Sequence, residues 1–332
     1  MLSMTQASPP TPCHRPLCGT QAESHIADRL GWPLPTLLQF PKFLLIETIN
    51  QCNARCIMCG IDFDSRQKIT MSDELFAKIV AELAQHADHV EKVMLYLDNE
   101  PLLDRRLHEK IRLVKQAGIR CVNIATNGSL FTRNRSVELI EAGLDEIYIT
   151  LDSLDKATYE SIRVGLTFER TLQGILSFIE ERDRRGFGPR IRLQMIQLEV
   201  NRHETDRFSD HWRSRLGPHD TIAIQKAHSW GNQVTVPVED EESANHYPCI
   251  ALWGTFVIHA QGQVGMCCVD TGLTRLLGNV TSASIAEIWN GTHLERIRKL
   301  HLAGMRSCIP LCNGCTLWRE DKRSLESPTR IH

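Results

Sequence analysis

Three cysteines, Cys52, Cys56 and Cys59, form a C-x3-C-x2-C run directly after an apolar segment that is predicted to be a strand. Thiolates are soft ligands, which select zinc, copper(I) or iron–sulfur clusters. A structural zinc site usually has four protein ligands, and no fourth Cys or His follows at the spacing of a zinc finger. A [4Fe–4S] cluster held by three cysteines instead keeps one iron open to a small molecule. The run therefore favours a cluster with an open iron, with a zinc knuckle or a chance trio of cysteines as the alternatives.

A second group of cysteines lies between residues 249 and 315. Its members are Cys249, Cys267, Cys268, Cys308, Cys312 and Cys315. The first three belong to a predicted hairpin with Gly262 near its turn, and the last three follow a predicted helix over residues 285–303. Two thiolates from the hairpin and two from the later loop can converge on a second iron–sulfur cluster. Zinc is the alternative, because a four-cysteine zinc site would use the same spacing.

The other cysteines, Cys13, Cys18 and Cys121, are isolated in the sequence. Cys121 lies in an apolar segment and is predicted to be a small core residue. Cys13 and Cys18 could form a ligand pair, but we prefer to place them in a disordered leader. The clustering of the other cysteines argues for metal rather than disulfides, and no export signal is visible, so a reducing cytoplasm is expected.

The composition excludes several classes of protein. The 332 residues have a formal net charge of −2 and no block of Lys and Arg, so there is no electrostatic footprint for nucleic acid. No run of about 18 apolar residues is present, which argues against a membrane span. The first residues lack the apolar core of a signal peptide. A length of 332 residues suits one large domain and a smaller one.

Six strand-like segments alternate with helical patterns. They are Phe43–Ile49, Val93–Leu97, Cys121–Thr126, Glu146–Leu151, Ile191–Leu198 and Thr221–Lys226. This alternation predicts an α/β fold with a parallel sheet and right-handed crossovers, and six such units predict a partial (β/α)6 TIM-like barrel. We expect a poorly ordered leader over residues 1–40, the barrel over 41–235, a small cysteine-rich domain over 245–320 and a tail over 321–332.

Polar residues follow several of the predicted strands. The segments 98–101 (DNEP), 126–128 (TNG) and 152–153 (DS) come directly after strands two, three and four. In parallel α/β folds the chemistry lies on loops at the carboxyl ends of the strands. Each segment alone would be interpreted as an ordinary turn. After strand six, His228 or Lys226 could accept a proton, although a histidine on a solvated loop is the simpler interpretation.

The C-x3-C-x2-C run resembles the signature loop of the radical S-adenosylmethionine (radical SAM) superfamily. The resemblance implies that SAM chelates the open iron of a [4Fe–4S] cluster held by the three cysteines. It implies that Glu100, in a turn similar to the family's Gly-Gly-Glu-Pro motif, receives the SAM amino group. Asn127, Asp152 and Ser153 would lie near the ribose and carboxylate of SAM, and Arg163 would pair with the carboxylate. Two departures are the missing glycines of the turn and Met58, where the family commonly has an aromatic residue.

The later cysteines resemble the auxiliary-cluster extensions called SPASM and, in shortened form, twitch. The resemblance rests on the motif C-x12-G-x4-C followed by a late C-x2-C pair. Together with this extension, the radical SAM resemblance covers roughly residues 40–320. It implies a second, auxiliary [4Fe–4S] cluster on Cys249, Cys267, Cys312 and Cys315. Cys268 and Cys308 are left over, so either could substitute as a ligand or donate a hydrogen atom.

The family resemblance implies reductive cleavage of SAM to a 5′-deoxyadenosyl radical that abstracts hydrogen from a small-molecule substrate, with an external electron donor such as flavodoxin or ferredoxin. The first hypothesis is oxidation of a hydroxyl of a carbohydrate or aminocyclitol, with the auxiliary cluster as electron acceptor. The second is epimerisation with a cysteine hydrogen donor, and the third is maturation of a ribosomal peptide. A zinc-binding interaction protein would explain both cysteine groups but not the polar loops.

Overall fold

A computed structural model describes residues 16–61, 67–235, 245–315 and 317. Six parallel strands follow one another in the sheet in the order of the sequence, as predicted for a partial TIM-like barrel. They are β1 (Phe43–Ile46), β3 (Lys92–Met94), β4 (Cys121–Thr126), β5 (Glu146–Thr150), β7 (Arg190–Gln197) and β8 (Thr221–Lys226). The predicted α/β fold class is therefore confirmed.

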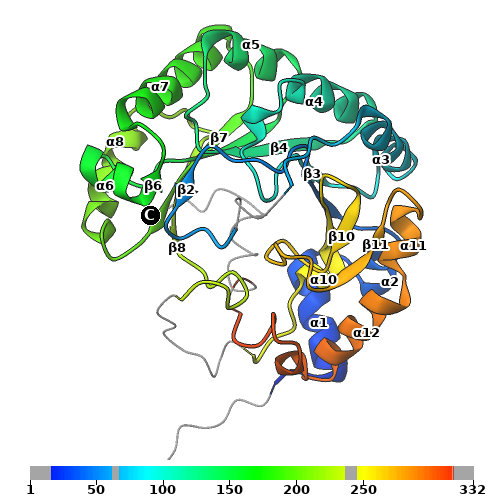
Figure 1. The fold of residues 1–332 in the computed structure, drawn as a ribbon. Helices are drawn as coiled ribbons and strands as arrows, with labels where there is room; N and C mark the ends of the chain where they lie inside the picture. The colour runs from blue at the N-terminus through cyan, green and yellow to red at the C-terminus, as the bar shows by residue number, and fades with distance from the viewer. Residues whose placement is uncertain (1–15, 62–66, 236–244, 316, 318–332) are drawn as a thin grey trace, which may run out of the picture.

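Helices cover the outer face of this curved sheet, where they form the arch in Figure 1. They are α3 (Asp73–Gln85), α4 (Leu107–Gln116), α5 (Arg133–Glu141), α7 (Phe168–Arg185) and α8 (Thr205–Arg213). Local sequence explains where they begin: the Ser72 hydroxyl accepts a hydrogen bond from the Leu75 amide and caps α3. Phe76, Ile79 and Leu83 then lie on one face of α3 and are buried.

The inner face of the sheet is polar near the amino ends of the strands. Lys92 on β3 forms an ion pair of 2.6 Å with Glu146 on β5, and Arg190 on β7 also contacts Glu146. The Arg192 guanidinium lies 5.1 Å from the centre of the Tyr148 ring. Buried charges are tolerated only when they are paired, so this network closes the floor of the barrel. The candidate site residues lie at the opposite, carboxyl ends of the strands.

Three strands of the C-terminal region extend the same sheet. They are β9 (Thr255–Ile258), β10 (Gln263–Gly265) and β11 (Leu276–Asn279). The hairpin predicted around Gly262 is β9–β10, and Gly262 has the positive φ of +83° that favours glycine. Its first strand pairs in parallel with β1, which the sequence did not predict. The described strands therefore form one sheet in the order β11-β10-β9-β1-β3-β4-β5-β7-β8.

The single helix predicted over residues 285–303 is wrong, because the segment forms two helices, α11 (Ile285–Trp289) and α12 (Thr292–Leu302). Gly291 has an extended backbone between them, with φ −69° and ψ 152°. The shorter elements are α6 (Lys156–Ile162), α10 (Ala251–Gly254), η1 (Pro101–Leu103), η2 (Arg202–Glu204), η3 (Arg306–Cys308) and the two-stranded sheet of β2 (Arg55–Cys56) and β6 (Arg163–Val164).

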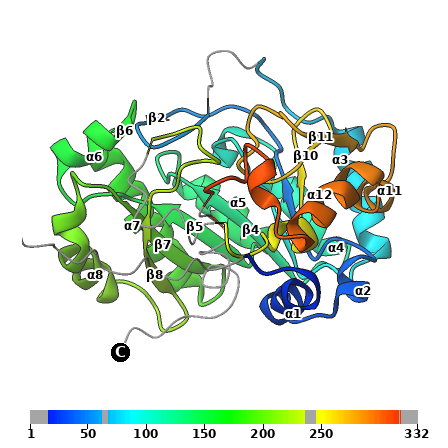
Figure 2. The same cartoon turned by 90° about the horizontal axis from the view of Figure 1, so that it is seen from below.

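The leader expected over residues 1–40 is folded from residue 19 onward, so the expectation of poor order is wrong there. It forms α1 (Gly19–Leu30) and α2 (Leu34–Leu37), and α1 lies beside α12 in Figures 1 and 2. Ala22, Ile26 and Leu30 recur every four residues and are buried, a helical stripe that the Pro-rich start obscured. Cys13 and the expected tail at 321–332 lie outside the described residues.

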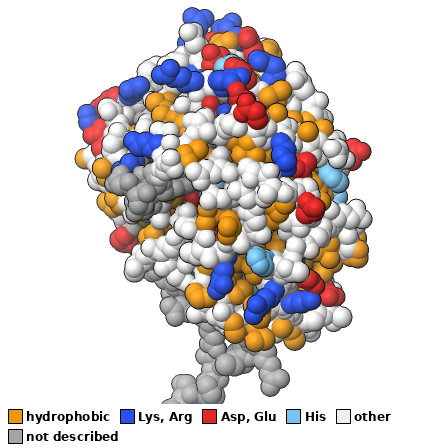
Figure 3. Space-filling view, turned by 45° about the vertical axis from the view of Figure 1, so that its right-hand side comes forward, with side chains coloured by type: hydrophobic (Ala, Val, Ile, Leu, Met, Phe, Trp, Pro, Cys, Tyr) orange, Lys and Arg blue, Asp and Glu red, His pale blue; other side chains and the backbone are white. Residues whose placement is uncertain are grey.

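Positive and negative side chains intermingle on the face in Figure 3, and neither sign dominates a contiguous area. Among the described residues, no helix combines the length and the apolar character that a membrane crossing requires.

Candidate functional site

The first cysteine loop is tied to α6 and β6. Cys56 on β2 stands opposite Arg163 on β6 in the antiparallel pair, and the Ile57 amide donates to the Ile162 carbonyl oxygen over 3.0 Å. The Cys59 amide donates to the Cys56 carbonyl oxygen, also over 3.0 Å, which closes a tight turn between the last two cysteines. These hydrogen bonds fix the backbone of the cysteine loop against β6 and the end of α6.

The thiols of this loop are close enough to influence one another. Burial, with smaller contributions from negative charge on Glu100, Cys56 and Cys59, raises the pKa of Cys52 to about 12. Burial likewise raises the pKa of Cys59 to about 11, with a contribution from Cys56. None of the described cysteines is in a disulfide. Such thiols stay protonated at neutral pH, so a metal that binds them must displace the protons.

Arg163 and Asp152 form a chain of contacts that reaches the thiol of Cys56. The Arg163 Nη1 lies 3.2 Å from the Cys56 Sγ, and its Nε donates to Oδ2 of the buried Asp152. Asp152 Oδ1 accepts from the Ile196 amide over 2.8 Å. Burial alone would lower the pKa of Arg163, but the neighbouring carboxylate and thiol outweigh burial and raise it. The structure thus brings three of the predicted site residues together around one fixed cation.

Glu100 organises the loop after β4. Its Oε1 accepts from the Thr126 hydroxyl over 2.6 Å and from the Leu102 amide over 3.0 Å, while Oε2 accepts from the Asn127 amide over 2.8 Å. Burial raises the pKa of Glu100, opposed by these hydrogen bonds. Much of the carboxylate's capacity is therefore used within the chain, which the family resemblance did not reveal.

Asn127 contacts the first cysteine loop directly. Its Nδ2 donates to Asn53 Oδ1 over 2.9 Å, and Asn53 Nδ2 donates to the Ser129 hydroxyl over 2.8 Å. Sequence reasoning missed Asn53 and Ser129. Only their positions, next to Cys52 and directly after the predicted 126–128 turn, could have pointed to them.

Ser153 is fully buried and serves the loop after β5. Its hydroxyl donates to Glu204 Oε1 over 2.6 Å, and Glu204 Oε2 accepts from the Leu154 amide over 2.9 Å. Asn201 Nδ2 donates to the Asp152 carbonyl oxygen over 2.7 Å. Glu204 and Asn201 therefore support the Asp152–Ser153 segment from behind, and no sequence pattern identified Glu204 in advance.

The second cysteine group converges as well. Burial raises the pKa of Cys267 well above its ordinary value, and Cys268, Cys312 and Cys249 contribute. Burial raises the pKa of Cys312 to about 12, with Cys315 among the contributors and Arg306 opposing the shift. The hairpin thiols and the late C-x2-C pair are thus neighbours, as a shared cluster requires. Cys308, at the end of η3, is exposed.

Arg306 clamps the backbone of this second group. The buried guanidinium donates to the carbonyl oxygens of Tyr247, Cys312 and Cys315 over 2.8, 2.9 and 3.0 Å. It thereby joins the segment before Cys249 to the late cysteine loop. No sequence pattern identifies Arg306, two positions before Cys308, as a supporting residue, and the sequence analysis did not predict it.

The loop after β8 joins the two cysteine groups. Trp230 Nε1 donates to the Met58 carbonyl oxygen over 2.9 Å, and a Cβ at Gly60 would lie only 2.9 Å from the indole. Two residues later, Asn232 Nδ2 donates to the Asn313 carbonyl oxygen over 2.5 Å. His228 in this loop is half-buried, and burial lowers its pKa to about 4, which makes it a weak proton acceptor.

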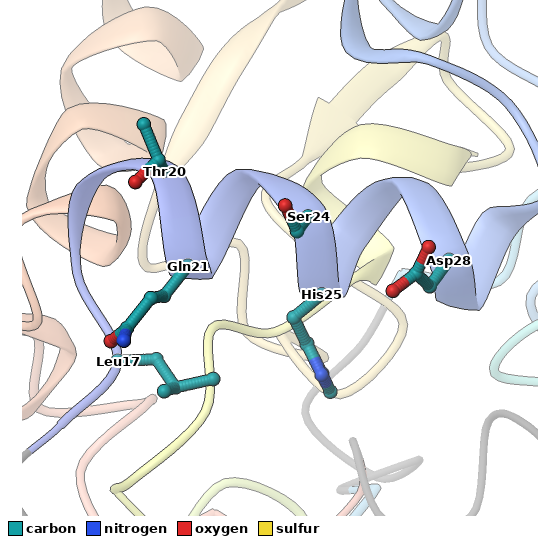
Figure 4. A pocket seen from close by; sticks show the side chains of 6 residues that line it. All are labelled: Leu17, Thr20, Gln21, Ser24, His25 and Asp28. Carbon is teal, nitrogen blue, oxygen red and sulfur yellow. The ribbon is translucent and has the colours of Figure 1, made fainter.

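A pocket along α1 borders the segment before Cys249, because the ring of its lining residue His25 stacks on that of Tyr247 with centroids 4.7 Å apart. Figure 4 shows its lining side chains along the helix. They are Leu17, Thr20, Gln21, Ser24, His25 and Asp28, none of which was predicted to be a site residue.

Comparisons with known proteins agree with this arrangement. The model of the radical SAM superfamily matches residues 46–184, which include the first cysteine loop and Arg163. The model of SPASM, an iron–sulfur cluster-binding domain, matches residues 249–316, which include all six later cysteines.

Curated relatives include two described as probable GTP 3',8-cyclase. That of Saccharolobus islandicus is 32% identical over 181 residues, and that of Methanothermobacter thermautotrophicus is 30% identical over 184 residues. Both alignments cover 54% of this chain and 54% of the relative. The chain therefore spans about half the length of the curated relatives it matches.

Among solved structures, BtrN in complex with AdoMet and 2-DOIA has a TM-score of 0.58 and 18% identity, with 83% of this chain and 92% of BtrN covered. Streptococcus suis SuiB bound to precursor peptide SuiA has a TM-score of 0.62 and 14% identity, with 79% of this chain and 67% of SuiB covered. At these identities the likeness shows the fold.

Proposed function

Because the chain belongs to the radical SAM superfamily and carries an SPASM domain over residues 249–316, we propose that it oxidises a hydroxyl group of a carbohydrate or aminocyclitol. Its cofactors are a [4Fe–4S] cluster with SAM and an auxiliary iron–sulfur cluster. When bound, the reduced first cluster and SAM supply a radical that takes one hydrogen atom from the substrate. The electron for that reduction comes from a small donor protein such as flavodoxin or ferredoxin.

The cysteines divide between the two clusters. We assign Cys52, Cys56 and Cys59 to the first cluster, supported by their shared loop and their mutual effect on pKa. The proposed auxiliary ligands are Cys249, Cys267, Cys312 and Cys315, supported by the convergence of the hairpin and the late pair. These assignments leave one iron of the first cluster without a protein ligand.

Residues at the strand ends would hold SAM. Arg163 is fixed beside Cys56 by Asp152, and we propose that it pairs with the SAM carboxylate. Glu100 Oε2 accepts a hydrogen bond from Asn127, and a carboxylate oxygen has room for a second one, here from the SAM amino group. Asn127 and the Asp152–Ser153 segment would border the ribose.

One observation carries the choice of oxidation: the auxiliary cysteines are built onto the barrel itself. Strand β9 pairs with β1, and the charge of Cys268 contributes to the raised pKa of Tyr96, which follows β3. This supports the proposal that the auxiliary cluster lies close enough to the carboxyl ends of the barrel strands to accept an electron from the substrate. After hydrogen abstraction the substrate must lose one further electron and one proton, and a neighbouring auxiliary cluster can take the electron.

Epimerisation is the second candidate, favoured by the same position of Cys268. A thiol beside Tyr96 could return a hydrogen atom to the substrate, whereas Cys308 is exposed at the end of η3. Cys268→Ala would then abolish turnover and Cys308→Ala would not. For oxidation, both variants should keep substrate turnover.

The test is anaerobic reconstitution with reductant, followed by measurement of 5′-deoxyadenosine and of product mass. The screen covers sugars and aminocyclitols, and also GTP because of the curated relatives. A product lighter by two hydrogens supports oxidation. A product of unchanged mass that gains deuterium at carbon in heavy water supports epimerisation and overturns the oxidation proposal.

A further inference from the structure

Three ligating side chains meet at the carboxyl ends of neighbouring strands, outside both cysteine groups. Glu47 directly follows β1, His259 directly follows β9, and Asp98 lies on the loop after β3. One ligand atom from each lies within 4.8 Å of the others. The residues are almost completely buried, with exposed fractions of 1%, 3% and 1%. They come from strands that are adjacent in the sheet, in the order β9-β1-β3.

His259 points into this group without a hydrogen bond. Within the described part of the chain, neither of its ring nitrogens has a hydrogen-bond partner. Its Nδ1 lies 3.7 Å from Glu47 Oε2, which is too long for a hydrogen bond. Room for the imidazole comes from Gly265, where a Cβ would lie 3.2 Å from Nε2. A buried imidazole with two unmet nitrogens is costly, so the position calls for a ligand.

The backbone fixes Glu47 in place. Its Oε2 accepts from the Ala260 amide over 3.0 Å, and its own amide donates to the Ile258 carbonyl oxygen over 2.8 Å. Two buried carboxylates at this separation repel each other when both are ionised, and a cation between them removes that repulsion. Glu47, Asp98 and His259 are therefore arranged around a position that favours a cation.

We propose that Glu47, Asp98 and His259 bind one divalent cation. Carboxylate and imidazole donors suit Mn²⁺, Fe²⁺ and Zn²⁺, whereas the nearby thiolates suit iron–sulfur clusters, so the chain separates two kinds of metal by ligand type. Metal–ligand distances of about 2.1 Å place tetrahedral donors roughly 3.4 Å apart. The 3.7 Å between Glu47 and His259 is close to that value, and Asp98 has a ligand atom within 4.8 Å of both, so side-chain movements on the order of 1 Å would complete the site.

The site would also join the two parts of the protein. Glu47 and Asp98 lie in the segment matched by the radical SAM family, and His259 lies in the SPASM segment. Three protein donors leave coordination positions open. On the proposed function, on which this step rests, hydroxyl oxygens of the substrate fill those positions and are held beside the first cluster.

Mn²⁺ binding tests the proposal on the reconstituted holoenzyme without any substrate. With the clusters oxidised and diamagnetic, the electron paramagnetic resonance signal of free Mn²⁺ reports how much ion remains unbound. We expect one Mn²⁺ per wild-type chain. His259→Ala and Glu47→Gln each remove a ligand and should weaken binding by about tenfold or more. Asp210→Asn, on an exposed carboxylate, is the matched control and should bind as the wild type does.

Cluster absorbance and 5′-deoxyadenosine formation are measured on the same samples. If Glu47→Gln does not fold, His259→Asn replaces it. The proposal is overturned if wild type binds no Mn²⁺ at millimolar concentration, or if both ligand variants with intact clusters bind it as tightly as wild type. The first outcome would assign the three residues to an ammonium or hydroxyl group of the substrate. Loss of SAM cleavage in wild type would instead count against the proposed function.

Discussion

The two cysteine groups are built in opposite ways. The first comes from a single loop of eight residues, and its thiols are half-buried, with Arg163 beside Cys56. The second is gathered from a hairpin and a distant loop: Cys249 and Cys267 are half-buried like the first group, whereas Cys312 and Cys315 are buried behind the Arg306 clamp. A cluster that binds a co-substrate needs access, whereas one that only accepts an electron works best when sealed. On the proposed function, the deeper burial of Cys312 and Cys315 is the arrangement expected of the cluster that only accepts an electron.

The largest effect should come from removing one ligand on each side of this comparison. Cys56→Ala should reduce 5′-deoxyadenosine formation to background, because SAM can no longer be cleaved. Cys312→Ala should lose roughly four irons per chain yet still cleave SAM, while substrate oxidation stops. Iron analysis and chromatography of 5′-deoxyadenosine check both variants. Equal SAM cleavage in the two variants would contradict the proposal that only the first cluster cleaves SAM.

Arg306→Ala should destabilise the region around the second cysteine group. Three buried carbonyl oxygens lose their donor, at about 1 kcal/mol each, so the free energy of unfolding should fall by about 3 kcal/mol. Arg306→Lys should recover only part of the lost free energy of unfolding, because an ammonium group cannot span three acceptors. Anaerobic urea unfolding followed by circular dichroism measures this. The exposed Arg213→Ala should change stability by less than about 0.5 kcal/mol, and an equal effect there would contradict the clamp.

Asp152→Asn should impair SAM cleavage at the first cysteine group. The substitution keeps the shape but removes the charge that holds Arg163 against Cys56, so SAM cleavage should fall by about 10- to 100-fold, mainly through a higher KM for SAM. Steady-state formation of 5′-deoxyadenosine at varied SAM measures the effect. Asp155→Asn, which alters only an exposed helix cap, is the control. An unchanged KM would mean that Arg163 does not serve SAM.

The smallest effect should come from the loop between the two groups. Trp230→Phe removes the hydrogen bond to the Met58 carbonyl oxygen, which is worth about 1 kcal/mol, and keeps an aromatic ring against Gly60. We expect nearly normal SAM cleavage and a slightly lower thermal midpoint. A large loss of turnover with normal SAM cleavage would instead show that the indole is needed between the clusters.

The sequence predicted the parts of this protein that depend on spacing along the chain. The six barrel strands follow from alternating strand-like and helical segments, and the first cysteine loop follows from C-x3-C-x2-C. The leader differs from the prediction because its Pro-rich start precedes a helix whose buried stripe is only Ala22, Ile26 and Leu30. The segment at 285–303 forms two helices instead of the predicted one because glycine is costly within a helix, and Gly291 instead adopts an extended backbone before α12.

The residues that support the sites could not be predicted, because their partners are distant in sequence. Arg306 contacts Tyr247 across 59 residues, and Asn53 contacts Ser129 across 76. Glu47 and His259 meet only because β9 pairs with β1, and the sequence does not reveal which face of a strand is turned inward. The family resemblance likewise suggested a role for Glu100 without showing the three hydrogen bonds it already accepts.

The pairing of β9 with β1 also limits how the protein can be divided. A truncated barrel that stops before residue 249 would expose the β1 edge, with the Glu47 amide stripped of the Ile258 carbonyl oxygen. Bare strand edges promote aggregation. The two halves should therefore melt together as one cooperative unit, and a gene fragment encoding the barrel alone should yield inclusion bodies.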